Sequence, residues 1–120
     1  MTHSRILIVE DNPLLAMAME ETVSFLGHEV VGPATSLRTG MERAIEGGFD
    51  YALLDFDLGA GETSVLIARA LLEQGIAFAF VSGTKRGVIR EQFSDIPILS
   101  KPLGDSDLQT LLAGEWQQPL

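Results

Sequence analysis

The chain has 120 residues, of which 46% are hydrophobic, and this suits a single compact domain that spans residues 1–120. Its 17 acidic and 8 basic residues give a net charge of −9, which disfavours nucleic acid or an anionic membrane as a partner, because both require a basic surface. The sequence has no cysteine and no apolar run of the roughly 20 residues that cross a membrane. We therefore expect an intracellular protein, located in the cytoplasm.

The first apolar run, residues 6–9, predicts a buried strand that ends in two acids, Glu10 and Asp11. Asp11 or Asn12 can cap the helix that follows. The apolar residues of this helix recur at helical spacing until Gly27: Leu15, Met19, Val23 and Leu26. Taken alone, the acidic pair is most simply explained as a helix cap and a solvated acid.

A second strand is predicted around Val30 and Val31, followed by a helix that Ser36 caps and that ends at Gly47. His3 and His28 have no second histidine or cysteine near them in the sequence, so a metal site there is disfavoured. We expect both histidines at the surface or at a strand end.

The third apolar run, residues 51–54, stops abruptly at Asp55 and is soon followed by Gly59. This pattern predicts a strand buried on both faces, whose last side chain emerges at the carboxyl edge of the sheet. Ligands bind at that edge in open α/β sheets. Asp55 is therefore the leading candidate for a reactive residue, whereas Asp57 alone is most simply a turn former.

The second half of the chain continues the alternation of helices and strands. Thr63 or Ser64 begins a helix that ends at Gly75 and carries these apolar residues: Val65, Leu66, Ala68, Ala70 and Leu72. Residues 76–81 predict a fourth buried strand that leads into Ser82. A short helix is predicted within residues 85–94, where only Val88, Ile89 and Phe93 are apolar anchors.

The last strand and helix follow. Residues 96–99 predict a fifth strand, and Pro97 suits an edge position because proline cannot donate a ladder hydrogen bond. Lys101 and Pro102 come directly after this strand. Asp105 or Ser106 then caps a last helix that carries Leu108, Leu111 and Leu112.

Five strands that alternate with five helices predict a doubly wound α/β domain, with a parallel sheet covered on both faces. Because all the strands run in the same direction, their final side chains must gather along one edge. The residues concerned are Glu10, Asp11, Asp55, Ser82 and Lys101.

Three carboxylates at this edge would repel one another by about 4 kcal/mol per pair, at a separation of about 4 Å and an effective dielectric constant of about 20. They require a cation, and oxygen ligands without histidine or cysteine favour Mg²⁺, which also binds phosphate oxygens. An aspartate beside such a metal can attack a phosphoryl group. The Lys101 ammonium and the Ser82 hydroxyl could stabilise the phosphoryl oxygens.

In these residues the sequence strongly resembles the receiver domain of bacterial response regulators, the CheY-like family, over residues 5–113. The resemblance implies a flavodoxin-like sheet of strand order 2-1-3-4-5. It implies that Asp55 accepts a phosphoryl group from a histidine kinase phosphohistidine, with Ser82 as the switch hydroxyl and Lys101 as the conserved lysine of the family. It also implies a Mg²⁺ site made by Glu10, Asp11, Asp55 and the backbone carbonyl of Asp57, and a cis peptide bond between Lys101 and Pro102.

The sequence departs from the family pattern at two positions. Ile98 stands where most members have the tyrosine or phenylalanine that moves inward on activation, and Gly59 replaces a common proline. Residues 80–83, Phe-Val-Ser-Gly, partly resemble the motif of the FATGUY single-domain receivers, which also lack that aromatic residue.

Two other functions compete with the receiver interpretation. One is a haloacid-dehalogenase-like phosphatase, in which Asp55 and Asp57 would be the nucleophile and the second aspartate; however, such enzymes place their metal-binding acids late in the chain. The other is a degenerate receiver that acts only as a docking module.

The receiver interpretation makes the protein a phosphoacceptor that catalyses only its own phosphorylation and dephosphorylation. Its expected partners are a sensor histidine kinase or phosphotransfer protein and a downstream target protein, because the sequence indicates no output domain unless it was excised from a longer protein. Residues 83–90 are the expected mobile output element, since glycines bracket a polar stretch directly after Ser82. Trp116 is a weaker candidate for a docking residue.

Overall fold

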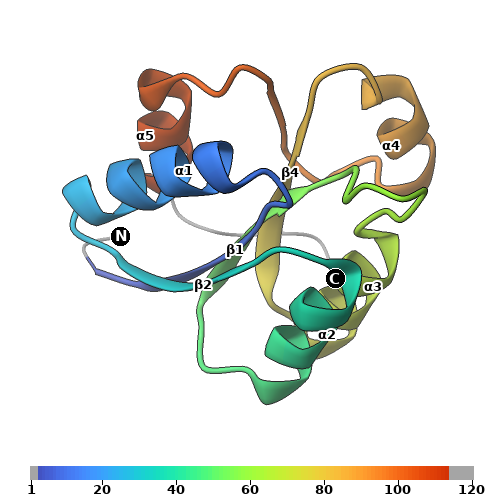
Figure 1. Ribbon diagram of the computed structural model, residues 1–120, viewed down its shortest axis with the longest axis horizontal. Coiled ribbons are helices and arrows are strands. Elements are labelled where there is room, and N and C mark those ends of the chain that lie inside the picture. Colours follow the sequence, from blue (N-terminus) through green and yellow to red (C-terminus); the bar gives the residue numbers. More distant parts are fainter. Residues whose placement is uncertain (1–2, 114–120) are drawn as a thin grey trace.

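Five strands form one parallel sheet in the order β2-β1-β3-β4-β5, as predicted. The computed structural model describes residues 3–113, so Trp116 lies outside the described residues. Figure 1 shows the sheet crossing the middle of the molecule, with helices on both sides. The strands are β1 (Arg5–Val9), β2 (Glu29–Ala34), β3 (Tyr51–Asp55), β4 (Ala77–Ser82) and β5 (Ile98–Ser100).

The helices cover both faces of the sheet because neighbouring residues of each strand point to opposite sides. Leu54 and Phe80 belong to one apolar cluster and Leu53 and Val81 to the other. The first cluster packs against α2, α3 and α4, and the second packs against α1 and α5. The helices are α1 (Pro13–Phe25), α2 (Leu37–Glu46), α3 (Val65–Gln74), α4 (Arg86–Gln92) and α5 (Asp105–Ala113).

Several helix and strand ends follow from local chemistry. Asn12 caps α1, where its side chain accepts from the backbone of Leu14 at 2.9 Å. Ser36 caps α2 through a reciprocal capping box with Thr39. The expected cap of α5 is wrong: Asp105 is already the first helical residue, and its carboxylate instead accepts from the Thr22 hydroxyl of α1 at 2.9 Å. The fifth strand also begins two residues later than expected, at Ile98.

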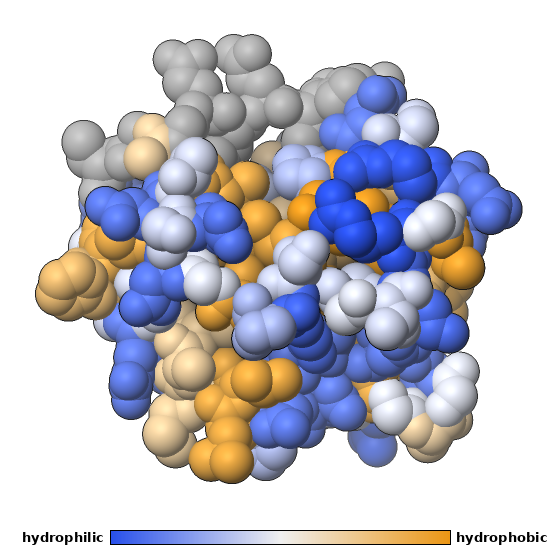
Figure 2. All heavy atoms as spheres, turned by 90° about the horizontal axis from the view of Figure 1, so that it is seen from above, coloured by the Kyte–Doolittle hydropathy of each residue, from blue (hydrophilic) through white to orange (hydrophobic). Residues whose placement is uncertain are grey.

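The helices α1 and α3 bury only some of their apolar residues. In α3 the core residues are Ile67, Ala68 and Leu71, whereas Leu66 is 58% exposed. Leu66 lies on the same side of the helix as the exposed residues Arg69 and Glu73, which follow it by three and seven positions, so this side faces the solvent. The helix α1 likewise exposes Phe25, among others, and Figure 2 shows apolar surface in orange beside polar surface in blue.

His28 is buried rather than exposed. It precedes β2, as a strand-end residue does, but its Nδ1 accepts a hydrogen bond from the backbone of Ser4 at 3.1 Å. The turn after α1 therefore folds onto the start of β1. His3 is exposed, and its Nδ1 lies 2.8 Å from the carbonyl oxygen of Gly27.

Gly40 allows α2 to approach α3 and the sheet closely. A Cβ atom at this position would lie 2.5 Å from Cδ1 of Ile67 and 3.3 Å from Cγ1 of Val9. Both neighbours are fully buried, so neither side chain can move aside without disturbing the core.

We expect Gly40→Ala to lower the free energy of unfolding by about 1–2 kcal/mol, because overpacking outweighs the gain in helix propensity of about 1 kcal/mol. The matched control is Gly87→Ala in α4, where an added Cβ meets no atom within 4 Å and should stabilise the protein. Urea unfolding of both variants checks this. Equal urea midpoints for the two variants would show that Gly40 does not set the spacing between α2 and its neighbours α3 and β1.

Candidate functional site

Three acids meet at the carboxyl edge of the sheet because their strands are neighbours. β1 pairs with β3 so that Val9 lies opposite Leu54, and the next residues, Glu10 and Asp55, therefore leave the sheet side by side. Asp11 follows Glu10. One carboxylate oxygen from each of the three acids lies within 4.8 Å of the other two. This confirms that the three acids predicted from the sequence gather at one edge.

Two of these acids are buried. Glu10 is 0% exposed and Asp55 is 3% exposed, whereas Asp11 is only partly covered. Oε2 of Glu10 accepts from the backbone of Asn12 at 3.1 Å, but its other oxygen has no hydrogen-bond partner among the described residues. A buried carboxylate oxygen without a hydrogen bond is unusual, and the charge of such an oxygen must be balanced by a nearby cation.

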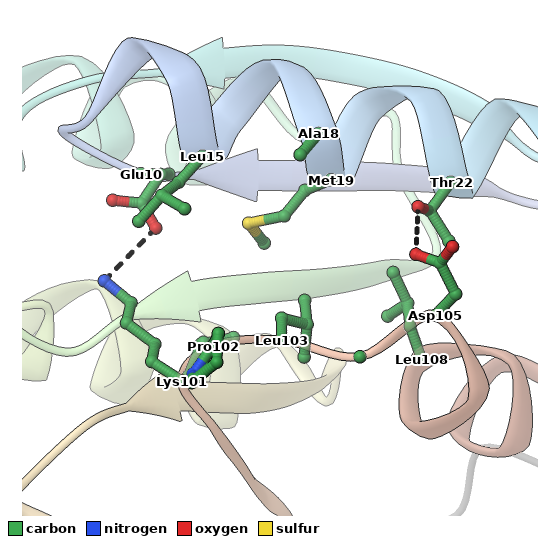
Figure 3. Close-up of a pocket in the computed structure, with 12 residues that line it drawn as sticks. Glu10, Leu15, Ala18, Met19, Thr22, Lys101, Pro102, Leu103, Asp105 and Leu108 are labelled. Atoms are coloured by element: carbon green, nitrogen blue, oxygen red, sulfur yellow. Dashed lines mark hydrogen bonds and ion pairs between the residues drawn. The ribbon is translucent and has the colours of Figure 1, made fainter.

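Lys101 supplies positive charge from the other side of the site. Its Nζ lies 3.0 Å from Oδ1 of Asp55 and 3.4 Å from Oε1 of Glu10. Figure 3 shows the side chain reaching from the loop after β5 to Glu10, which lies just before α1. The peptide bond between Lys101 and Pro102 is cis, as the family resemblance implied.

An apolar cavity surrounds the stem of Lys101. It has a volume of about 100 Å³ and is lined mainly by α1 and by the segment between β5 and α5 (Figure 3). Met19, Leu103 and Leu108 contribute to its wall. Apolar surroundings exclude water and lower the local dielectric constant, so they strengthen the attraction between Lys101 and the two buried acids.

Ser82 ends β4, the strand next to Asp55. It is 3% exposed, and it follows Val81, the residue that pairs with Asp55. Its Oγ accepts a hydrogen bond from the backbone of Lys85 at 3.1 Å. A hydroxyl group that accepts one hydrogen bond can still donate its own proton, so Ser82 is able to donate a hydrogen bond to an oxygen atom bound at the edge of the sheet.

Asp57 lies in the loop after β3, and its side chain is exposed and outside the cluster of the other three acids. The loop bends sharply: Gly59, Ala60 and Gly61 have φ values of 82°, 54° and 77°. Proline cannot adopt a positive φ, so this backbone explains why Gly59 stands at the position. A Cβ on Gly59 would lie 3.3 Å from Oδ2 of Asp11, which the sequence did not reveal.

The electrostatics of the cluster oppose the ionisation of Asp55. Burial, with Glu10 and Asp11 close by, raises the pKa of Asp55 to about 8, although Lys101 counteracts this. Burial raises the pKa of Asp11, but its hydrogen bonds with Asp55 and Glu10 outweigh burial and hold it below its ordinary value. Burial lowers the pKa of Lys101, but its contact with Asp55 outweighs burial and raises it.

These shifts make the stability of the protein depend on pH. Asp55 binds a proton in the folded chain up to a pH near its pKa of about 8, but in the unfolded chain only below its ordinary value of 3.8. The free energy of unfolding should therefore fall as the pH rises from about 5 to about 8. Urea midpoints in the presence of a chelator measure this, and Asp55→Asn should flatten the curve. An equally steep curve for the variant would assign the titration to another group.

The described residues contain no helix that is long and apolar enough to span a membrane. No family model matches the sequence, and a search of curated proteins finds no significant relative.

Solved structures do resemble the chain. SdrG from Sphingomonas melonis Fr1 is 35% identical with a TM-score of 0.82, over 94% of this chain and 96% of that one. The response regulator PhyR from Brucella abortus is 25% identical with a TM-score of 0.81, over 92% of this chain but only 46% of that one.

A response regulator receiver protein from Sinorhizobium medicae WSM419 is 22% identical, with a TM-score of 0.82 over 91% of this chain and 90% of that one, which supports the fold alone. The sheet order of the CheY-like fold, the edge residues and the SdrG likeness over nearly the whole length of both chains agree. This chain belongs to the response regulator receiver domains.

Proposed function

We propose that Asp55 accepts a phosphoryl group from a phosphohistidine of a sensor histidine kinase or phosphotransfer protein. The observation that carries this proposal is the geometry of one carboxylate. Asp55 ends a buried strand, lies beside Glu10 and Asp11, and is 3.0 Å from the Lys101 ammonium. No other aspartate in the described residues combines a strand end, a cluster of acids and a lysine contact.

The donor set fits Mg²⁺. The three clustered acids offer only oxygen atoms, and one of them, Oε1 of Glu10, is buried without a hydrogen bond. Hard divalent cations prefer such ligands. Glu10, Asp11 and Asp55 would hold the ion, with the backbone carbonyl of Asp57 as the further ligand that the family resemblance implies. When bound, Mg²⁺ would neutralise the acids and the charge on the phosphoryl oxygens.

The transfer is a displacement at phosphorus. An Asp55 carboxylate oxygen forms the new P–O bond while the P–N bond to the donor imidazole breaks, and the imidazole leaves with the bonding electron pair and takes up a proton. The Lys101 ammonium, already beside Asp55, stabilises the phosphoryl oxygens. The Ser82 hydroxyl donates to one of these oxygens from the neighbouring strand.

The protein acts in this scheme as a signalling domain and not as an enzyme with a separate substrate. Phosphorylation changes the surface that residues 83–90 present to a downstream target protein, since these residues begin directly after Ser82 and contain Lys85, which is bonded to it. No nucleic acid or membrane takes part, in line with the net charge of −9. We assign the pathway to the cytoplasm on the family resemblance.

The first test is chemical labelling. Wild-type protein incubated with Mg²⁺ and acetyl phosphate should gain an acid-labile phosphoryl group on Asp55, and Asp55→Asn should lose it, because the amide keeps the shape but is no nucleophile. Asp95→Asn, a change of an exposed acid, is the matched control and should label normally. Mass spectrometry of the intact proteins measures the product.

The labelling experiment also separates the competing functions. An unlabelled wild type would identify a docking module, and label that turns over rapidly into free phosphate would favour a phosphatase. Equal labelling of wild type and Asp55→Asn would place the acceptor elsewhere.

The second test concerns the cation. Asp11→Ala should weaken Mg²⁺ binding at least tenfold, or about 1.4 kcal/mol, and should raise the urea midpoint of the metal-free protein because one repelling carboxylate is removed. Glu73→Ala, in an exposed position of α3, controls for the loss of a negative charge. Calorimetric titration measures the affinity, and equal Mg²⁺ affinities of the two variants would exclude Asp11 as a ligand.

A further inference from the structure

Two arginines of the short helix α4 bind strand β5 and the segment that precedes it. Nη1 of Arg86 donates to the carbonyl oxygen of Ile98 at 3.0 Å and to Oγ of Ser100 at 3.3 Å. One turn later, Nη1 of Arg90 donates to the carbonyl oxygens of Ser94 at 2.8 Å and Ile96 at 2.9 Å. Figure 2 shows strongly hydrophilic surface gathering on the right, the side on which Figure 1 draws α4.

These contacts add to the packing of Ile89, Phe93 and Ile98, the buried side chains that join α4 and β5 to the core. α4 has seven residues and β5 has three, and an isolated helix of that length is unstable in water. β5 is the edge of the sheet, and its partner β4 uses the other side of the strand, where Phe80 donates to the carbonyl oxygen of Pro97. The arginines therefore occupy carbonyl groups that a sixth strand would otherwise bind.

Arg86 differs from Arg90 in its position relative to the site. The hydroxyl group that it contacts belongs to Ser100, the residue before Lys101. The residue before Arg86 is Lys85, whose backbone N–H is bonded to Oγ of Ser82. Arg86 thus lies between the two residues that would stabilise the phosphoryl group, whereas Arg90 contacts only the segment that enters β5.

We propose that Arg86 is a positioning residue for the phosphoacceptor site, and this rests on the function proposed above. It holds the first turn of α4 against β5 and so keeps the backbone N–H of Lys85 hydrogen-bonded to Oγ of Ser82. In this resting arrangement Ser82 Oγ is held towards α4. A shift of Ser82 towards a phosphoryl oxygen on Asp55 that lengthens the bond to Lys85 is opposed by the Arg86 contacts.

This role suits the isoleucine at position 98. The contact between Arg86 and Ile98 uses the carbonyl group of the backbone and not the side chain, so it does not need an aromatic residue there. Besides the direct pairing of β4 with β5, a path from the Ser82 hydroxyl to β5 therefore runs through Lys85 and Arg86. Each link in this path is a hydrogen bond of 3.0–3.3 Å.

The expected size of the effect is modest because Arg86 is exposed and its hydrogen bonds compete with water. Loss of a contact that favours the resting state shifts the population towards the active state by the same factor. We expect this factor to be about threefold to tenfold, in the range typical of one exposed, charge-assisted hydrogen-bond pair.

The test compares Arg86→Gln with Arg90→Gln. Both variants lose a guanidinium that makes two hydrogen bonds, to β5 or to the segment before it, so both should lose a similar amount of stability towards urea. Arg86→Gln alone should speed amide hydrogen exchange at Lys85 in the metal-free protein, and it alone should speed labelling by acetyl phosphate, each by about threefold or more. Ser100→Ala should reproduce part of the change and add little in the double variant with Arg86→Gln.

Repetition of the exchange measurement with Mg²⁺ and BeF₃⁻, the mimic present in one SdrG structure, should remove the difference at Lys85 between wild type and Arg86→Gln. If both arginine variants label and exchange alike, Arg86 has only a structural role and the proposal is wrong. If wild type is not labelled at all, the proposed function is wrong, while exchange at Lys85 still decides whether Arg86 holds the Lys85 amide on Ser82.

Discussion

Negative charge buried at the end of two adjacent strands is the constraint on which the rest of the structure depends. Glu10 and Asp55 are almost inaccessible to water, and such charges are tolerated only when they are paired or neutralised. The fold balances these charges in two ways: Lys101, which follows a third strand, β5, pairs with both acids, and the raised pKa of Asp55 lets this residue keep its proton. Both solutions are incomplete. One Glu10 oxygen has no hydrogen bond to the described residues, and Asp55, whose pKa is raised to about 8, loses its proton above that pH. A site with such unbalanced charge would bind a cation favourably, and with it a phosphoryl group.

The position of Lys101 depends in turn on the weakest strand of the sheet. β5 has only three residues, and the lysine follows it directly. The backbone N–H of Lys101 donates to the carbonyl oxygen of Ser82 at 3.1 Å, which ties the lysine to the last residue of β4. Lys101 and Ser82 are therefore joined by a backbone hydrogen bond, and a shift of either residue displaces the other. Stability at this edge and control of the site are thus provided by the same contacts.

The sequence predicted the sheet and the site well because both depend on a pattern that local chemistry enforces. An apolar run that ends in an acid marks a strand end, and parallel strands bring their ends together whatever the loops do. It failed where the answer depended on tertiary contacts. Nothing in the sequence near His28 indicated that this side chain would be buried and bonded to the backbone N–H of Ser4, or that the Asp105 carboxylate would bind Thr22 instead of capping α5. The contact of Arg86 with Ile98 joins residues twelve positions apart and leaves no local pattern.

The replacement of an aromatic residue by Ile98 changes how a signal can cross this domain. A side chain that swings between two positions can transmit a change over several ångströms, but isoleucine at 8% exposure is fixed in the core and has no such second position. Any change at Ser82 must then pass through backbone hydrogen bonds, which respond to shifts of a few tenths of an ångström. Such a path is short and directional: it leads from the edge of β4 through the amide of Lys85 into the first turn of α4. In the path that we propose, a displacement at Ser82 then reaches β5 through the first turn of this helix, which Arg86 bonds to Ile98 while Ile89 packs in the core.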